Sequence, residues 1–577
     1  MKKAIVSFKN FSYKYVSQES PTLHDLNLDI FEGEIALIAG PSGCGKSTLG
    51  NCMNGLIPNS YKGEMQGSVK VMGHETRDRS LFDLSKTVGT VLQDTDAQFI
   101  GLTVGEDIAF ALENDAVAQE EMKERVRTAA VRVGMNAFLD RSPHDLSGGQ
   151  KQRVSLAGVL VDPVRLLLFD EPLANLDPAA GKQTMQLIDR IHRVSGITVV
   201  IIEHRLEDVL EIDVDRVIVL SEGRIVADAP PNKLLASEVL RKNGVREPLY
   251  LSALKKAGIA VTPDLHPEHI ETLDLSVIRK PLVSWAQAKG RDEDKAAAAS
   301  ALNLSQVSFQ YKTGLPVLRD VSFSIGKGER IGIVGKNGAG KSTLTKLICG
   351  LEKPMSGSLF FQGSDMKDWT IKERSEHIGL VMQSPNQMIS QQMIFDEVAF
   401  GLRIRGTDPR KIEERVYETL KICGLYPFRH WPVSALSFGQ KKRVTIASIL
   451  VLRPDILILD EPTAGQDYRH YTEIMRFLDQ LNNQGMTIVM ITHDMHLLLE
   501  YTDRAIVMTD GVKIADRSPA QLLSDPETAA RAGLKTTSLF RLAERIGFPD
   551  PPDFVERFIV EEREERSHYG HANAEFY

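Results

Sequence analysis

One glycine-rich segment occurs twice in this chain, and this duplication constrains the fold more than any other feature. Residues 40–48 read Gly-Pro-Ser-Gly-Cys-Gly-Lys-Ser-Thr, and residues 335–343 read Gly-Lys-Asn-Gly-Ala-Gly-Lys-Ser-Thr. The same further motifs follow each copy, in the same order and at nearly the same intervals. The two halves align with few gaps, which indicates a tandem domain duplication and not a short-period solenoid.

The composition limits the class of protein. A chain of 577 residues is too long for one ordinary hydrophobic core, so roughly two to four domains are expected. The content of 42% hydrophobic and 25% charged residues is typical of a soluble globular protein. The net charge of -8 is small for this length, and it implies neither a nucleic-acid-binding surface nor a polyacidic tail. We therefore expect no nucleic-acid partner.

Segments for membrane insertion or secretion are not expected. The longest apolar runs fall far below the roughly 18 residues that cross a bilayer, and the N-terminus lacks the apolar stretch of a signal peptide. The four cysteines show neither paired metal spacing nor a disulfide framework. They are expected to be reduced thiols in the cytosol.

Within each half, short apolar runs alternate with longer amphipathic stretches. Residues 35–39 and 197–202 have the pattern of buried strands, and residues 120–133 and 182–194 have that of helices. This alternation predicts an α/β fold with a largely parallel sheet, formed twice. A second, shorter repeat follows each half and predicts a helical appendage, with a mere linker as the alternative for the first copy. The charged tail after Pro551 is predicted to be solvated and partly disordered. The expected boundaries are 1–228 and 302–517 for the two α/β domains, 229–265 and 518–577 for their appendages, and 266–301 for the connection.

The glycine-rich segments have the sequence context of a phosphate-binding loop, between an apolar strand and a helix. Glycines let successive backbone N–H groups face one concavity, and the helix that follows adds its positive end. The lysine supplies charge for the β- and γ-phosphates of ATP, and the serine after it offers a hydroxyl to Mg²⁺. The predicted ATP-binding residues are Gly40, Ser42, Gly43, Gly45, Lys46, Ser47 and Thr48, and Gly335, Asn337, Gly338, Gly340, Lys341, Ser342 and Thr343.

An Asp-Glu pair ends a buried apolar run in each half, at residues 170–171 and 460–461. Because successive strand residues point to opposite faces, the two acids of a pair cannot do the same job. One is suited to hold hydrated magnesium, and the next to orient or deprotonate water. Acids that only cap the next helix are the alternative, which the following prolines keep open. The assigned Mg²⁺ ligands are Asp170 and Asp460, and the assigned catalytic bases are Glu171 and Glu461.

A Leu-Ser-Gly-Gly-Gln motif at residues 146–150 recurs as Leu-Ser-Phe-Gly-Gln at residues 436–440. By itself such a motif would be only a helix N-cap. Its interval to the following Asp-Glu pair, however, is identical in the two halves. Phe438 stands where the first copy has glycine, and its side chain is expected to restrict the backbone and make the two sites unequal.

The order of these motifs resembles that of the ATP-binding-cassette (ABC) ATPases, over both halves of the chain. The resemblance implies two tandem P-loop NTPase domains, each with a helical subdomain and a short helical C-terminal appendage. It also implies that they form a head-to-tail pair of cassettes within the chain and enclose two ATP molecules. The signature motif of each half would then complete the site of the other half. Site one would combine Lys46, Gln93, Asp170, Glu171 and His204 with Ser437 and Gly439; site two would combine Lys341, Gln383, Asp460, Glu461 and His493 with Ser147 and Gly149.

The same resemblance implies roles for four further pairs of residues. The tyrosines would stack on adenine, the glutamines would sense Mg²⁺ and the membrane partner, the histidines would contact the γ-phosphate, and the aspartates would form loops between the cassettes. A lone histidine is more often structural, which is the alternative for the third pair. These pairs are Tyr15 and Tyr311, Gln93 and Gln383, His204 and His493, and Asp177 and Asp467.

Further local patterns are similar to the ATPase subunits of energy-coupling-factor importers of vitamins or transition-metal ions. They are the glutamine-rich stretches 93–98 and 383–387, the Ala-Phe helices 106–112 and 396–402, and the segment 461–467. The first half lacks the proline of this pattern. The resemblance implies integral-membrane scaffold and substrate-binding subunits as partners, and a peripheral place on the cytoplasmic face of the membrane. A fused sugar-importer ATPase and a soluble twin-cassette translation factor are the alternatives, and the sequence does not identify the solute.

Overall fold

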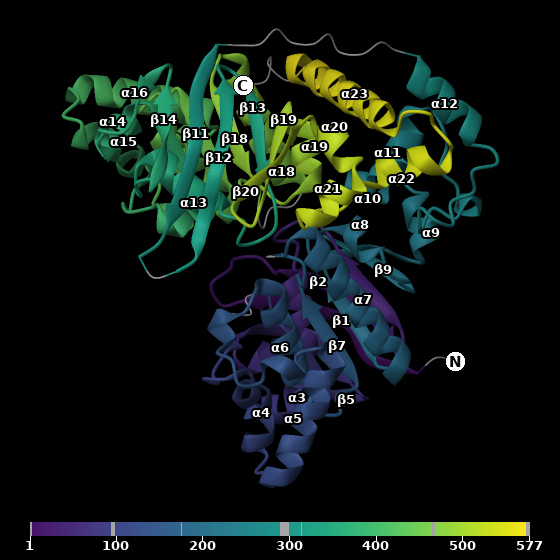
Figure 1. The fold of residues 1–577 in the computed structure, drawn as a ribbon. Coiled ribbons are helices and arrows are strands. Elements are labelled where there is room, and N and C mark those ends of the chain that lie inside the picture. The colour runs from purple at the N-terminus through teal and green to yellow at the C-terminus, as the bar shows by residue number, and fades with distance from the viewer. Residues whose placement is uncertain are drawn as a thin grey trace. The chain divides into compact units, whose positions relative to one another are not determined.

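The computed structural model describes residues 3–93, 98–174, 176–288, 299–312, 314–463 and 468–572. The chain folds into two compact units, Met1–Leu282 and Val283–Tyr577 (Figure 1). None of the helices in the described ranges combines the length and the apolar composition that a bilayer crossing requires.

The first unit contains two sheets. An antiparallel sheet has the strand order β2-β1-β4-β5, and a six-stranded sheet has the order β10-β9-β3-β8-β7-β6, in which only β10 runs antiparallel to its neighbour. All residues of β3 and β8 are buried, as expected for parallel strands covered on both faces. The strands are β1 (Ala4–Tyr15), β2 (Leu23–Phe31), β3 (Ile35–Ala39), β4 (Gly63–Val71), β5 (His74–Glu75), β6 (Val88–Val91), β7 (Leu166–Asp170), β8 (Thr198–Ile202), β9 (Arg216–Ser221) and β10 (Arg224–Ala229).

Helices complete this unit. Side chains of both sheets and of α1 form one core, which includes Phe8, Ile38 and Leu49. Helices α4, α5 and α6 contact one another and form the predicted helical subdomain. The helices are α1 (Lys46–Met53), α2 (Leu56–Asn59), α3 (Leu81–Ser85), α4 (Val104–Asn114), α5 (Gln119–Val133), α6 (Gly148–Leu160), α7 (Pro178–Ser195), α8 (Leu206–Val209), α9 (Pro231–Leu235), α10 (Val239–Lys242) and α11 (Leu249–Lys256).

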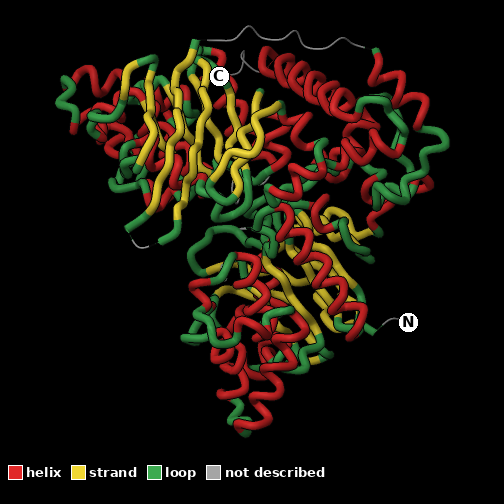
Figure 2. The backbone as a smooth tube through the Cα atoms, viewed as in Figure 1, coloured by secondary structure: helices red, strands yellow, loops and turns green. Residues whose placement is uncertain are grey.

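The second unit repeats this topology. Its antiparallel sheet has the order β12-β11-β14-β15, and its six-stranded sheet has the order β16-β17-β18-β13-β19-β20. Figure 2 shows these strands in yellow with helices in red beside them. The prediction of two tandem α/β domains, each with a helical subdomain and an appendage, is confirmed. The strands are β11 (Ser300–Gln310), β12 (Pro316–Gly326), β13 (Arg330–Val334), β14 (Ser356–Phe361), β15 (Ser364–Asp365), β16 (Ile378–Val381), β17 (Ile456–Asp460), β18 (Thr487–Ile491), β19 (Arg504–Thr509) and β20 (Val512–Arg517).

Among the described residues its helices correspond to those of the first unit, except that α2 has no counterpart and that the second appendage continues into the additional helix α23 (Pro551–Ala572). They are α13 (Lys341–Cys349), α14 (Ile371–His377), α15 (Ile394–Ile404), α16 (Pro409–Ile422), α17 (Phe438–Leu450), α18 (Tyr468–Asn483), α19 (Met495–Tyr501), α20 (Pro519–Leu523), α21 (Pro526–Arg531), α22 (Ser538–Arg545) and α23 (Pro551–Ala572).

The tail after Pro551 is not solvated throughout, so that prediction is wrong for its first part. Residues 551–572 form α23, and Phe554, Val555, Phe558 and Ile559 on this helix are buried. These four residues recur at helical spacing among the charged residues, and so form an apolar stripe that packs on the unit. Residues 573–577 lie outside the described part of the chain.

The segment predicted as a connection contains folded structure. Helix α12 (Arg279–Gln287) lies within it, and Ile278 and Leu282 are fully buried. Farther along, the Trp285 indole donates a hydrogen bond to Glu561 on α23 over 2.8 Å, and its ring packs edge-on against Phe554. This part of the connection is thus docked on the C-terminal helix of the second unit.

Candidate functional site

The first glycine-rich loop joins β3 to α1. Gly40 and Gly45 have positive φ, and a Cβ on either would collide with a neighbour: 2.1 Å from the Leu220 carbonyl oxygen at Gly40, and 2.7 Å from Leu23 at Gly45. The buried Lys46 ammonium donates to the carbonyls of Gly40 and Pro41, both at 2.8 Å. The loop is therefore closed around the lysine, as a phosphate cradle requires.

The second loop, between β13 and α13, has the same geometry. Gly335 and Gly340 have positive φ, and a Cβ on Gly335 would lie 1.9 Å from the Met508 carbonyl oxygen. The Lys341 ammonium donates to the carbonyls of Gly335 and Lys336, at 2.6 and 3.0 Å. The two predicted nucleotide loops are thus alike in backbone and in lysine placement.

Ser47 and Asp170, two of the three residues predicted at the Mg²⁺ site of the first half, lie together. The Ser47 hydroxyl donates to Asp170 over 3.2 Å. Burial raises the pKa of Asp170, while the hydrogen bond from Ser47 and the charge of Lys46 oppose that shift. A hydroxyl and a carboxylate are the hard oxygen ligands that Mg²⁺ prefers, so this donor set fits the ion. The Gln93 side chain, by contrast, contacts the neighbouring glutamate.

The predicted catalytic glutamate of the first half is held by Gln93. Its amide donates to Glu171 over 2.7 Å, whereas His204 Nδ1 lies 3.9 Å from the other carboxylate oxygen. Burial raises the pKa of Glu171, and the nearby His204 lowers it less. Glu171 has a φ of 49°, which places its backbone in the left-handed region, a strained conformation for a residue other than glycine. A raised pKa makes this carboxylate a stronger base toward water.

In the second half His493 contacts the predicted catalytic glutamate, Glu461, whereas Gln93 contacts the equivalent Glu171 in the first half. His493 Nδ1 lies 2.7 Å from Glu461 Oε1, and the Thr492 hydroxyl donates to Glu461 Oε2 over 3.4 Å. Glu461 has φ of 46°, so the backbone strain is shared with the first half. Burial and the charge of Glu461 raise the pKa of Asp460. The two halves therefore hold equivalent glutamates by different partners.

One cause of this difference escaped sequence reasoning. Thr492 corresponds to Glu203, which is completely buried next to His204 and lies 3.5 Å from its Nδ1. A second carboxylate thus competes with Glu171 for the histidine. The residue before each histidine was visible in the sequence, but nothing there indicated that its side chain turns toward the ring.

The predicted adenine-stacking tyrosines lie beside the nucleotide loops. The Tyr15 hydroxyl is 3.1 Å from the Thr48 hydroxyl, and the Tyr311 hydroxyl is 3.4 Å from that of Thr343. Each tyrosine is therefore positioned at the first turn of the helix that follows the loop.

The signature serines begin helices α6 and α17. Ser147 and Ser437 each form a capping box with the glutamine three residues later, and both serines are exposed. Phe438 is the first residue of α17, and the helical backbone conformation is open to residues with any side chain. The backbone at this position therefore does not require glycine, and Gly149 and Gly439 are each the second residue of their helix. The inequality of the two sites stays a prediction. Asp177 caps α7 by accepting from Ala180 N over 2.9 Å, and Asp467 lies outside the described residues.

Lys442 is a site residue that the sequence did not reveal. Its side chain, 1% exposed, donates to the carbonyls of Met382 and Gln383, both at 2.8 Å. Burial lowers its pKa to about 8, although Asp460 and Glu461 raise it. Its counterpart Gln152 donates instead to the Pro172 carbonyl. A buried cation thus anchors the segment of Gln383 in the second half alone.

Apolar side chains are exposed near both glutamines. Leu92 and Met382, the residues directly before the two glutamines, are 38% and 41% exposed, and Ile100 and Leu102, a few residues after Gln93, are 65% and 82% exposed. Exposed apolar side chains are frequent at interaction surfaces.

Comparisons with known proteins agree with the repeat. A family model described as ABC transporter matches residues 23–174 and 318–464. A second model, described as ATP-binding cassette cobalt transporter, matches residues 237–309. A putative ABC transporter ATP-binding protein of Clostridium perfringens is 56% identical over 566 residues, covering 98% of this chain and all of that protein. One from Enterococcus faecalis is 56% identical over 567 residues, with 98% and 100% coverage.

A solved structure is also similar. It is cbiO1 from Clostridium perfringens, described as part of the ABC transporter complex cbiONQ. The sequences are 33% identical, with a TM-score of 0.39, over 43% of this chain and 100% of that one.

Proposed function

The chain belongs to the family of ABC transporter ATP-binding proteins, and on that premise we propose that it is the ATPase subunit of an importer of transition-metal ions. Proteins of this family are ATPases. The observation that carries the finer proposal is the match of residues 237–309 to the cobalt-transporter family model. That match covers most of the first appendage and the connection and ends within β11 of the second domain. Most of it therefore lies outside the two ATPase cores, where a general ABC ATPase need not resemble a metal transporter.

Hydrolysis would take place at two composite sites. The Lys46 loop would hold the phosphates of one ATP and the Lys341 loop those of the other. The exposed Ser147 and Ser437, each at a helix start, present N–H groups suited to bind the γ-phosphate held by the opposite half. Because the two halves are one chain, this pairing would be intramolecular.

Within each site, the residues of this chain would position water and protons. Ser47 and Asp170, with their equivalents Ser342 and Asp460, would hold Mg²⁺, which supplies charge neutralisation for the phosphates when bound. Glu171 and Glu461 would accept a proton from the attacking water. Gln93 in one half, and His493 in the other, would orient the glutamate through the 2.7 Å contacts.

Coupling to transport would act through the apolar surfaces near Gln93 and Gln383. We expect integral-membrane subunits to insert helices there, which would place the protein at the cytoplasmic face of the membrane. ATP binding would favour the closed pair of cassettes and hydrolysis the open pair, so that differential nucleotide affinity does the mechanical work.

The test is uptake of radiolabelled cobalt by cells that express this protein with its native membrane subunits. The wild type should accumulate the ion in an ATP-dependent way, and the Glu171→Gln and Glu461→Gln variants should lose uptake while the complex still assembles. Uptake that is unaffected by both substitutions, or ATP-dependent uptake of a vitamin and not of cobalt, would overturn the proposal.

A further inference from the structure

The first unit contains a hollow at the end of the parallel sheet opposite the catalytic residues. It has a volume of about 820 Å³ and is lined by the ends of α6 and α7, the turn between β2 and β3, and the residues that lead into β7. This volume falls within the roughly 300–1,000 Å³ of small-ligand sites. Asp170 lies at the other end of β7, so the hollow is separate from the proposed ATP site.

Three arginines from three different elements line this hollow. Arg132 is on α5, Arg165 directly precedes β7, and Arg190 is on α7. All three are exposed, and none of their side chains forms a hydrogen bond or ion pair with a residue in the described ranges. Their donor groups therefore remain available to a ligand.

The acidic residues of the hollow do not neutralise these arginines. Glu32 pairs with Lys3 over 2.9 Å, and Asp162 pairs with Arg125 over 2.8 Å. Neither of these two cations is part of the lining. Cations outside the lining thus pair with both carboxylates. The three arginines of the lining place three positive charges at the hollow, in a chain whose net charge is -8.

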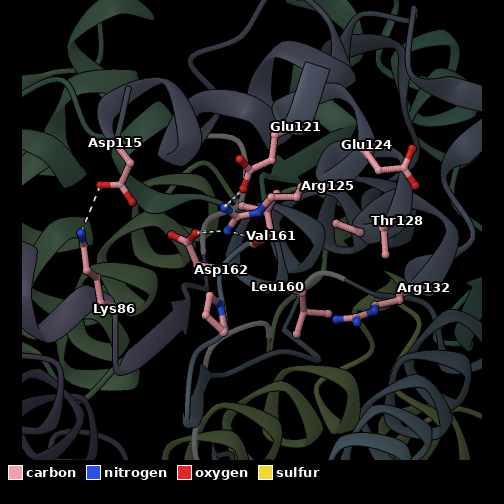
Figure 3. Close-up of a pocket in the computed structure, with 12 residues that line it drawn as sticks. Lys86, Asp115, Glu121, Glu124, Arg125, Thr128, Arg132, Leu160, Val161 and Asp162 are labelled. Atoms are coloured by element: carbon pink, nitrogen blue, oxygen red, sulfur yellow. Dashed lines mark hydrogen bonds and ion pairs between the residues drawn. The ribbon is translucent and has the colours of Figure 1, made fainter. Parts of the chain in front are cut away.

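In the adjoining hollow, the cations Lys86 and Arg125 are paired with carboxylates. That region, about 590 Å³, shares Arg132 and Asp162 with the first (Figure 3). There Arg125 donates to Asp162 and to the Val161 carbonyl, and Lys86 lies 3.3 Å from Asp115. Figure 3 draws no interaction to Arg132. Within the described lining of this adjoining hollow, Arg125 and Lys86 are paired, whereas Arg132 has no such partner.

The second half of the chain serves as an internal comparison. The residues that correspond to the three arginines are Ile422 at the end of α16, Asp455 directly before β17, and Gln480 on α18. Asp455 pairs with His377 over 2.7 Å. The same fold thus forms without any arginine at these positions, so the fold does not require the cluster.

From these observations we propose that the hollow of Arg132, Arg165 and Arg190 binds a phosphate-bearing anion. The guanidinium group matches the oxygens of phosphate with paired N–H donors, and three such groups favour a ligand with several negative charges. Val194, 84% exposed, also lines the hollow and offers contact to an apolar portion of the ligand. A soluble polyphosphate compound and an anionic lipid headgroup share this chemistry.

The experiment uses the full chain with saturating Mg-ADP, which occupies the ATP sites. Binding of inorganic tripolyphosphate is measured by calorimetry, and binding to vesicles of phosphatidic acid in phosphatidylcholine by sedimentation. The test variant carries Arg132→Gln, Arg165→Gln and Arg190→Gln. The matched control carries three substitutions of exposed arginines outside the hollow, Arg79→Gln, Arg127→Gln and Arg224→Gln.

We expect the wild type and the control to bind one of the two probes, and the test variant to bind it at least about tenfold more weakly. Binding of tripolyphosphate identifies a soluble ligand, and binding of vesicles alone identifies a lipid headgroup. A single Arg165→Glu variant, with a thermal melting curve, checks that the loss does not come from unfolding. Failure of the wild type to bind either probe, or equal weakening in test variant and control, would overturn the proposal. Neither result depends on cobalt uptake or on pairing of the ATP sites.

Discussion

The buried Lys442 offers a sharp test of how the second half is organised. We predict that Lys442→Met strongly lowers turnover at the site of Glu461, while the free energy of unfolding falls by no more than about 3 kcal/mol. Its ammonium donates to two carbonyls in the segment of Gln383. Methionine preserves most of the buried stem and removes both hydrogen bonds.

Two opposing effects set the magnitude for stability. Each hydrogen bond from a charged donor contributes about 1.5–3 kcal/mol. Burial lowers the pKa of Lys442 to about 8, so keeping it charged at neutral pH costs about 3 kcal/mol, which the substitution relieves. The net loss of stability is therefore about 0–3 kcal/mol. The effect on turnover has no such compensation, because the backbone carbonyls of Met382 and Gln383 lose the hydrogen bonds that hold the segment of Gln383 in place.

The assay is steady-state ATPase activity in a Glu171→Gln background, so that only the second glutamate is active, together with urea denaturation. We expect kcat to fall about tenfold or more, which corresponds to about 1.4 kcal/mol, with KM for ATP little changed. Lys442→Arg should restore most of kcat, since arginine also donates to carbonyls. Lys441→Met is the matched control, because that neighbour is only half-buried. Equal losses of kcat in Lys442→Met and Lys441→Met would refute the reasoning.

Three further results are expected. His493 lies 2.7 Å from Glu461, whereas His204 lies 3.9 Å from Glu171, so His493→Ala should lower kcat more than His204→Ala. ATPase assays with one active glutamate at a time compare the two variants. Equal losses of kcat would contradict the asymmetry. Burial raises the pKa of Glu171, so this base takes up its proton at a higher pH than an ordinary glutamate does. Turnover in a Glu461→Gln background should therefore fall as the pH drops through that raised pKa. A pH–rate profile whose acid limb lies at or below the usual glutamate pKa of about 4.3 would contradict this. Arg330 is 13% exposed and bonds two aspartates at 2.9 Å, so Arg330→Met should lower the free energy of unfolding by about 3 kcal/mol; urea denaturation measures it, and a loss below about 1 kcal/mol would count against a buried ion-pair network.

Local sequence patterns were sufficient for the parts of the site that are built from consecutive residues. The loops around Lys46 and Lys341 and the acidic pairs at the ends of β7 and β17 follow from glycine spacing and strand periodicity. The same reasoning predicted a solvated tail, since the charges in α23 outnumber its apolar residues and hide the stripe that includes Phe554.

Contacts between distant segments were not accessible in this way. Lys442 reads as one more basic residue of an amphipathic helix, and only the packing of α17 against the segment of Gln383 makes it a buried anchor. Glu203 reads as the end of a strand, yet its burial beside His204 changes which partner holds Glu171. Such effects depend on side-chain direction across elements, which the order of motifs does not encode.

The central claim is that each ATP is held by the loop of one half and the signature serine of the other. Photocleavage of the ADP–vanadate complex tests it directly, because the trapped vanadate cuts the chain where it touches the backbone. In a Lys341→Ala variant, which should leave only the first loop loaded, we predict cleavage near Ser47 and near Ser437. Cleavage near Ser47 and Ser147, with none near Ser437, would contradict the account.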